Sequence, residues 1–246
     1  MDGLMIKVSG SLITDSKNRV NVAFLRDLSQ AVKQLSEYYD IGIVPGGGPV
    51  ARQYIESARE LGCTEAQADM VADKVQRICA TLIAVQLGNI AYPSPIDDID
   101  MATSVIRLNH KIGVISGKFP GQSSDNIAAQ VAGYLGINKL VKFSSVGGIF
   151  TADPKLDPSA KRINAITYDQ LIETVSGDTR RAGSSNIIDQ LCAKCIKNNN
   201  IELYVISPKE IKNIKDIIEN KLCAGTVVNK NGKRDNFISL SGNVRC

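Results

Sequence analysis

The chain has 246 residues, 43% of them hydrophobic, and a formal net charge of +4. This length and apolar content allow a sizeable core, which excludes a disordered chain. No aromatic-interleaved basic cluster is present, so we do not expect nucleic acid as a partner. No apolar run approaches the ~20 residues of a membrane span, and the start MDGLMIK lacks the pattern of a signal peptide. We therefore expect a cytoplasmic protein that uses small molecules and no membrane.

The first predicted element is a buried strand, LMIKV, in which Lys7 interrupts an apolar run. A helix follows Asn21, because Phe24, Leu25, Leu28, Val32 and Leu35 recur at helical spacing. The strand IGIV then runs into three glycines, and Pro49 suits the first turn of the next helix. Another helix directly after it starts at a capping box and runs to Gly88; the box is formed by Thr64 and Gln67.

The rest of the chain continues the alternation of strands and helices. Strands are predicted at KIGVIS, KLVKFSSV, IELYVIS and GTVVN, and helices open near Ser124, Thr167, Ser185 and Pro208. Residues 92–100 and 151–166 are predicted to be irregular. This order is typical of an α/β protein, a three-layer sandwich with a mostly parallel central sheet. We expect one domain over residues 1–229 and a loosely held tail over 230–246.

Six cysteines without a dense framework fit a reducing compartment. The pair Cys192 and Cys195 has the spacing of redox or zinc motifs, but it lies in a helical pattern and has no second pair at zinc spacing. We therefore expect these two side chains to pack in the core and expect no protein-held metal site.

The glycine run Gly46-Gly47-Gly48 formally matches the dinucleotide fingerprint G-x-G-x-x-A. The match is weak, because a long capped helix follows where a strand ending in an acidic residue should come. The Walker pattern is absent. Three glycines before a helix still allow backbone N–H groups to approach a phosphate at the positive end of that helix.

A second loop of this kind is GKFPGQSSD, which also follows a strand and opens a helix. The hydroxyls of Ser123 and Ser124 and the free N–H groups of the first turn suit another phosphate. The alternative is that Ser124 merely caps the helix and that Gly117 merely ends the strand.

Glycines follow three predicted strands, at Gly10, at 46–48 and at Gly117. Parallel strands bring their carboxyl ends to one edge of the sheet, where ligands of open α/β sheets bind. Two phosphate cradles with Lys7 between them suit phosphoryl transfer, which depends on positioning and charge stabilisation. The alternative is a strand lysine whose stem packs while its charge reaches solvent.

Five motifs in order, KVSGS, VPGGGPVARQYI, GKFPGQSSD, VGGIFTADPK and AGSSNIIDQLCAK, resemble the amino acid kinase family, most closely its archaeal-type UMP kinases. The resemblance runs from about Lys7 to about Val228. It implies transfer of the γ-phosphoryl group of ATP to UMP with Mg²⁺ as cofactor, and a homo-oligomer, by resemblance a hexamer. It also implies an acceptor-binding part over about 1–135 and an ATP-binding part over about 136–229.

The resemblance assigns a role to each matching residue. Lys7 would neutralise the charge on the transferring phosphoryl group, and Asp125 would hold Lys7 in position; these are the catalytic residues. The ATP-binding residues would be Gly10, Ser11, Gly48, Arg52, Ser144, Ser145, Phe150 and Asp153. The UMP-binding residues would be Gly47, Asp69, Gly117, Lys118, Phe119, Pro120, Gly121, Gln122 and Ser123. Plain alternatives exist, since Arg52 and Asp69 suit solvated helix faces and Phe150 suits a core.

Two departures from the family pattern bear on the substrate. Val146-Gly147-Gly148 stands where Val-Asp-Gly is usual, and Gln76-Arg77-Ile78-Cys79 stands where Thr-Arg-Leu-Asn is usual. Isopentenyl phosphate kinases of the same fold place a histidine soon after the glycine run, and PVARQYI has none; the one histidine, His110, is expected at the surface. Two other readings stay open: a kinase of another small phosphate or carboxylate, and a non-catalytic binding protein.

Overall fold

The computed structural model describes residues 1–15, 17–117, 122–154, 156–176 and 188–234. A seven-stranded sheet runs through it in the order β3-β2-β1-β4-β8-β9-β7. Neighbouring strands are parallel except β8 and β9, which are antiparallel. The strands are β1 (Asp2–Val8), β2 (Tyr39–Pro45), β3 (Gly113–Val114), β4 (Lys139–Phe143), β7 (Ala165–Thr167), β8 (Glu202–Ile206) and β9 (Thr226–Asn229).

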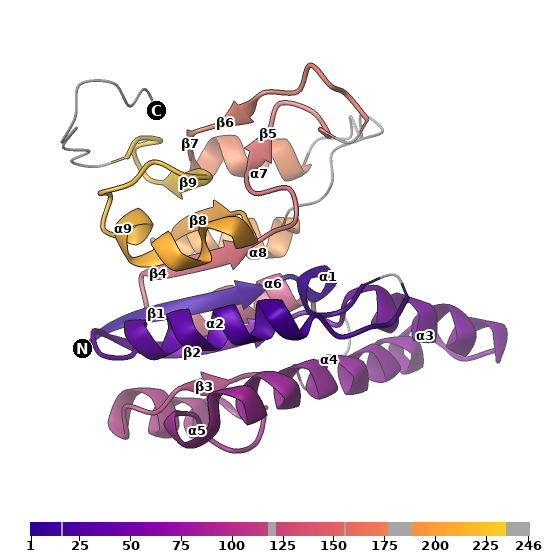
Figure 1. Cartoon of the computed structure of the whole chain (residues 1–246). Coiled ribbons are helices and arrows are strands. Elements are labelled where there is room, and N and C mark those ends of the chain that lie inside the picture. Colours follow the sequence, from indigo (N-terminus) through magenta and orange to yellow (C-terminus); the bar gives the residue numbers. More distant parts are fainter. Residues whose placement is uncertain (16, 118–121, 155, 177–187, 235–246) are drawn as a thin grey trace.

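Helices cover both faces of the sheet (Figure 1). The α-helices are α1 (Gly10–Ile13), α2 (Val22–Leu35), α3 (Gly48–Glu60), α4 (Glu65–Leu87), α5 (Ile99–Thr103), α6 (Ser124–Tyr134), α7 (Tyr168–Ser176), α8 (Gln190–Asn198) and α9 (Ile214–Ile218). The short helices η1 (Gly88–Ile90) and η3 (Pro208–Asn213) are 3₁₀, and η2 (Ser104–Leu108) is π-helical. One core cluster joins the sheet to α2, α4 and α9, and a second joins it to η2, α6, α7 and α8. The predicted three-layer α/β sandwich is confirmed.

The long helices begin and end where local chemistry predicts. Asn21 Oδ1 accepts a hydrogen bond from the Phe24 backbone N–H at the start of α2. Thr64 and Gln67 form the predicted capping box of α4, and Gly88 caps its end with a φ of +61°. Helices α3 and α4 follow each other without a strand and project together as an arm beyond the sheet (Figure 1).

Some predictions differ from the structure in detail. The helix predicted near Ser185 begins at Gln190, where Asp189 accepts a hydrogen bond from the Cys192 N–H; Ser185 itself is outside the described residues. The stretch 151–166, predicted to be irregular, contains β6 (Arg162–Ile163), which pairs antiparallel with β5 (Ile149–Phe150), and the start of β7. Strands of two or three residues are too short to show a period in the sequence. Most of the predicted tail, residues 235–246, lies outside the described residues.

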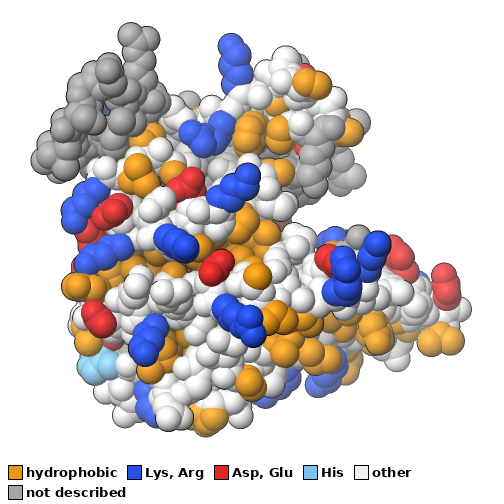
Figure 2. All heavy atoms as spheres, viewed as in Figure 1, with side chains coloured by type: hydrophobic (Ala, Val, Ile, Leu, Met, Phe, Trp, Pro, Cys, Tyr) orange, Lys and Arg blue, Asp and Glu red, His pale blue; other side chains and the backbone are white. Residues whose placement is uncertain are grey.

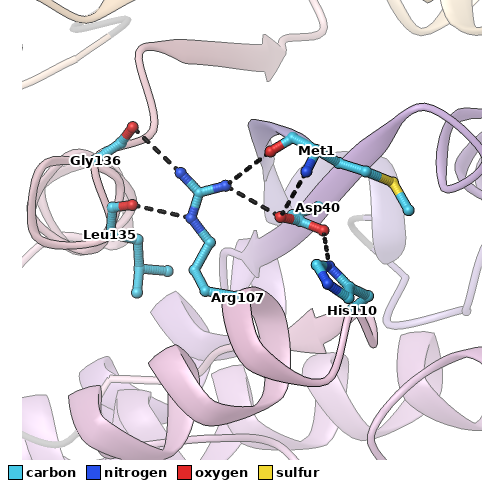
Figure 3. A network of polar contacts seen from close by, with 6 residues as sticks. All are labelled: Met1, Asp40, Arg107, His110, Leu135 and Gly136. Carbon is cyan, nitrogen blue, oxygen red and sulfur yellow. Dashed lines mark hydrogen bonds and ion pairs between the residues drawn. The ribbon is translucent and has the colours of Figure 1, made fainter.

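A polar network ties the chain together at the edge opposite the carboxyl ends of β1 and β2 (Figure 3). The Asp40 carboxylate is 3% exposed and accepts a hydrogen bond from Arg107 at 3.1 Å. His110 Nδ1 lies 2.7 Å from Asp40 Oδ1, and the amino group of Met1 lies 3.9 Å from Asp40 Oδ2, the oxygen that Arg107 contacts. Arg107 also donates to the Leu135 carbonyl at the end of α6. This network therefore joins β2, η2 and α6, and His110 is half exposed, as expected.

Candidate active site

The glycines after β1 and β2 bring two backbones into direct contact. A Cβ on Gly10 would lie 2.1 Å from the Gly48 N and 2.6 Å from the Gly46 O. Gly48 has a φ of +68°, a conformation that side chains other than glycine rarely adopt. Because β1, β2 and β3 are parallel neighbours, the three glycine-bearing loops after them meet at one edge of the sheet. The predicted convergence is confirmed.

Lys7 lies in β1 with its side chain buried; only 3% of it is exposed. Its Nζ donates a hydrogen bond to the Val8 carbonyl at 3.1 Å. The same Nζ and the Ser124 Oγ each lie 3.4 Å from the point where a Cβ on Gly46 would stand. The ammonium group is therefore directed to the edge where the loops meet, and the alternative of a lysine reaching solvent is wrong.

Asp125, in the first turn of α6, is paired with two lysines. Its Oδ1 accepts a hydrogen bond from Lys142 Nζ at 2.6 Å, while Lys7 Nζ lies 3.9 Å from the same oxygen. Lys142 is on β4, is nearly as buried as Lys7 and stands beside it in strand register. The expected pairing of Asp125 with Lys7 is therefore an ion pair without a hydrogen bond.

Lys142 was missed by the sequence prediction. Its signal was present, since KLVKF repeats the form of LMIKV, with one lysine among apolar residues of a strand. Register between the strands cannot be read from the sequence, and only register places the two lysines side by side.

The charges of this cluster shift its pKa values in a consistent way. Burial lowers the pKa of Lys7 to about 8, with Asp125 opposing and Lys142 adding to the effect. Burial alone would raise the pKa of Asp125, but Lys7 and Lys142 outweigh it and hold that pKa below its usual range. The carboxylate therefore stays charged at neutral pH, and the two ammonium groups leave an excess of one positive charge.

The N-termini of α6 and α8 meet beside this cluster. Ser123 Oγ accepts a hydrogen bond from the Asn126 N–H, which makes Ser123, and not Ser124, the N-cap of α6. The same hydroxyl donates to Asp189 Oδ2, and Asp189 caps α8. The positive ends of two helix dipoles therefore lie in one region, which favours negative charge there.

Two residues expected at the acceptor side, Gly47 and Gly117, lie against α4, the helix that carries Asp69. Gly47 stands against α4, since its Cβ would lie 3.6 Å from the Ala72 carbonyl, and Asp69 is half-buried on α4. A Cβ on Gly117 would lie 3.1 Å from Asp73 Oδ1. Burial raises the pKa of Asp73, a residue that the sequence prediction missed. Helical spacing from Asp69 to Asp73 was its signal.

A cavity of about 230 Å³ lies beside this region, between the end of β3 and helices α5 and α6. Its lining includes Gly117 and Gln122 of the predicted acceptor loop, together with Asp97, Ser116 and Gln130. Gln122 and Ser123 are exposed. Four residues of the predicted loop, Lys118, Phe119, Pro120 and Gly121, lie outside the described residues.

The residues expected at the ATP side lie on several elements. Ser144 is buried at the end of β4, where its N–H donates to the Ile206 carbonyl of β8, and Ser145 beside it is exposed. Phe150 is half-buried on β5, and Asp153 is half-buried in a turn. Two further residues are exposed on the first turns of their helices: Ser11 on α1 and Arg52 on α3.

The two departures from the family pattern have a structural basis. Gly147 has a φ of +70°, and its Cβ would lie 2.9 Å from the Ser207 Cβ, so a side chain there meets both strain and a neighbour. Cys79 is 2% exposed, within the core beneath α4, and burial raises its pKa to about 11. Gln76 is also buried, and its Nε2 has no hydrogen-bond partner among the described residues.

Cys192 and Cys195 have the spacing of redox and zinc motifs, so their burial and pKa values bear on both kinds of chemistry. Cys192 is 1% exposed and Cys195 is partly buried, and both are free thiols on α8. Burial raises both pKa values, which disfavours the reactive thiolate. Within the ranges that the structure describes, no three His, Cys, Asp or Glu side chains are grouped to hold a metal ion.

Comparison with known proteins places this chain in a family. Residues 4–207 match the family model of the amino acid kinase family. The uridylate kinase of Thermococcus kodakarensis is 34% identical over 92% of this chain and 98% of the relative. The uridylate kinase of Methanoculleus marisnigri is 34% identical over 94% of this chain and 97% of the relative.

Solved structures give the same result for the fold. The uridylate kinase from Archaeoglobus fulgidus superposes with a TM-score of 0.78 at 28% identity, covering 92% of this chain and 99% of that one. The UMP kinase from Bacillus anthracis also has a TM-score of 0.78, at 20% identity, covering 94% and 96%. The second likeness is one of fold alone.

Proposed function

We infer that this chain, which belongs to the amino acid kinase family, transfers the γ-phosphoryl group of ATP to UMP and gives UDP. The observation that carries this conclusion is the near-complete coverage of uridylate kinases at 34% identity, combined with a buried Lys7–Asp125–Lys142 cluster where the glycine loops meet. Phosphoryl transfer needs little covalent chemistry from the protein, and it needs positive charge in a fixed place.

The buried position of Lys7 supports its proposed role in stabilising the transferred phosphoryl group. Its Nζ is buried and, like the Ser124 Oγ in the first turn of α6, lies 3.4 Å from the point where a Cβ on Gly46 would stand. The proposed reaction is a direct displacement: the acceptor phosphate oxygen bonds to the γ-phosphorus as the bond to the β-phosphate oxygen breaks. No side chain forms a covalent intermediate in this proposal.

The individual binding roles are part of the proposal. ATP is proposed to contact Gly10, Ser11, Gly48, Arg52, Ser144, Ser145, Phe150 and Asp153, and UMP to contact Gly47, Asp69, Gly117, Gln122, Ser123 and the four loop residues between Gly117 and Gln122. The acceptor half is then residues 1–135 and the ATP half 136–229. Asp69 supports this division, because it lies on α4 together with Asp73, whose carboxylate faces Gly117.

Magnesium is proposed to enter with ATP. Mg²⁺ keeps several waters and binds chiefly through substrate phosphates, so a site with few protein ligands suits it. Asp125 is already engaged by two lysines and is a poor candidate ligand. When bound, the ion would supply charge neutralisation between the β- and γ-phosphates.

A homo-oligomer, by resemblance a hexamer, is proposed with an interface on the α3–α4 arm. Apolar side chains gather on this arm in Figure 2, and five large ones are exposed: Tyr54, Leu61, Met70, Ile78 and Val85. Exposed apolar groups on one element mark association surfaces. None of the described helices has the length and apolarity needed to cross a membrane, and a cytoplasmic location remains part of this proposal.

A coupled assay of ADP release tests the function against its two rivals. Purified protein with Mg-ATP is offered UMP, CMP, AMP and small phosphates and carboxylates in turn. Preference for UMP supports the proposal. Preference for another acceptor would show that the protein is a kinase whose substrate is not UMP. Tight calorimetric binding of UMP and ATP without UMP-dependent ADP release would leave only the non-catalytic binding protein.

The same assay on Asp125→Asn separates the positioning of Lys7 from nucleotide affinity. The amide cannot balance the charges of Lys7 and Lys142, so turnover should fall while both nucleotides still bind. Equal loss of binding and turnover would show that Asp125 is needed only to keep the site folded.

A further inference from the structure

The two buried lysines share one carboxylate and point to the same side of the sheet. Leu4, Ile6 and Val8 of β1 pack in the core under α2, while Met5 packs in the core under α6. Alternation along the strand therefore directs Lys7 to the α6 side. On β4, Val141 and Phe143 belong to the α2 side and Leu140 to the α6 side, which directs Lys142 the same way.

The two lysines differ in their distance from the Asp125 carboxylate. Lys142 holds Asp125 at 2.6 Å, whereas Lys7 stays 3.9 Å from the same oxygen and lies next to the Gly46 turn. The Asp125 carboxylate is partly buried, and a close cationic partner offsets the cost of removing its charge from water. Without Lys142, Asp125 would draw Lys7 into a direct contact and away from the glycine turn.

We propose that Lys142 is a positioning residue, which holds Asp125 and thereby leaves the Lys7 ammonium free for the transferred phosphoryl group. The proposal rests on the kinase function inferred above. It gives the cluster a stated charge: two ammonium groups and one carboxylate leave one positive charge for an incoming phosphate. It also predicts that Lys142 affects the reaction through Asp125 and Lys7.

The charged and titratable groups near Lys7 make this testable by pH. Among the residues that the structure describes, they are Asp125 on α6, Lys142 on β4 and Cys192 on α8. The active form of Lys7 is protonated, so kcat/KM should fall as the pH rises through its pKa. Removal of Lys142 abolishes a like charge and lets Asp125 approach Lys7; both changes raise that pKa and move the alkaline limb to higher pH.

The experiment compares native protein with Lys142→Met, which keeps an unbranched chain of similar size. At pH 7 we expect kcat to fall by about tenfold or more, with both KM values changed by less than about threefold. The alkaline limb of kcat/KM should move up by about half a pH unit or more. Lys139→Met is the matched control, because Lys139 begins the same strand and lies over the Tyr39 ring, away from Asp125.

A double-variant cycle separates this role from a structural one. If Lys142 acts through Asp125, adding Lys142→Met to Asp125→Asn should change kcat by less than about threefold. Multiplication of the two single effects would overturn the inference, as would an unshifted alkaline limb in folded Lys142→Met or Lys142→Gln. Glutamine keeps a hydrogen-bond donor without the charge, so it provides a folded variant if Met does not.

Failure of the proposed UMP kinase function and failure of the Lys142 inference give different results. Native protein without UMP-dependent ADP release refutes the UMP kinase, and the Lys142 comparison then runs on whichever acceptor the native protein uses. Native activity that is unchanged in Lys142→Met refutes the Lys142 inference and leaves the kinase intact.

Discussion

Replacing Gly10 by alanine should disable the site while leaving the fold in place. The new Cβ would stand 2.1 Å from the Gly48 N and 2.6 Å from the Gly46 O, both backbone atoms that cannot rotate away. An ordinary van der Waals contact needs about 3.5 Å, so the two loops must separate by about 1 Å. Such a misplacement between groups that position a reaction can cost about a hundredfold in rate.

The assay is UMP-dependent ADP release with saturating ATP, together with thermal unfolding followed by circular dichroism. We expect kcat to fall by about a hundredfold and the midpoint to fall by only a few degrees. Gly136→Ala is the control, because Gly136 has a φ of +63° but nothing within 4 Å of its Cβ position. It should lose about 1 kcal/mol of stability and no activity. A kcat for Gly10→Ala within threefold of native would refute the close approach as a requirement.

Three further predictions concern single side chains. Lys7→Ala should lower kcat by about a hundredfold or more. In the native protein, kcat/KM should fall above pH 8, because the charged form of a lysine with a pKa of about 8 is lost there. A native rate that is independent of pH up to pH 10 would contradict this. Asp69→Asn should raise the KM for UMP far more than the KM for ATP, and equal effects in initial-rate kinetics would remove Asp69 from the acceptor side. Asp40→Asn should lower the free energy of unfolding, measured with denaturant, by about 2 kcal/mol, because it leaves Arg107 without its buried counterion. Since this pair lies at the edge far from the site, kcat should not change. A loss of kcat at full stability would show that the two edges are coupled.

The sequence determined by itself the parts of this protein that depend on local chemistry. The capping box of Thr64 and Gln67, the Asn21 cap and the apolar strands specify elements within a few residues of themselves. The glycines that follow strands predicted loops at one edge of the sheet, because parallel strands bring their carboxyl ends to the same edge. The five motifs identified the family, since their order along the chain is a linear property.

Tertiary structure decided how closely the charges of the site meet. The resemblance predicted that Asp125 holds Lys7, but the 3.9 Å separation of their charged atoms depends on how α6 packs on the sheet. Lys142 looked like an ordinary strand lysine until register with β1 placed it beside Lys7 and 2.6 Å from Asp125. Asp73 likewise lies beside Gly117, in the proposed acceptor region, only through the approach of α4 to that glycine. Burial and distance set the strength of an electrostatic interaction, and neither is encoded at any single position, because both arise from the packing of elements that are remote in the chain.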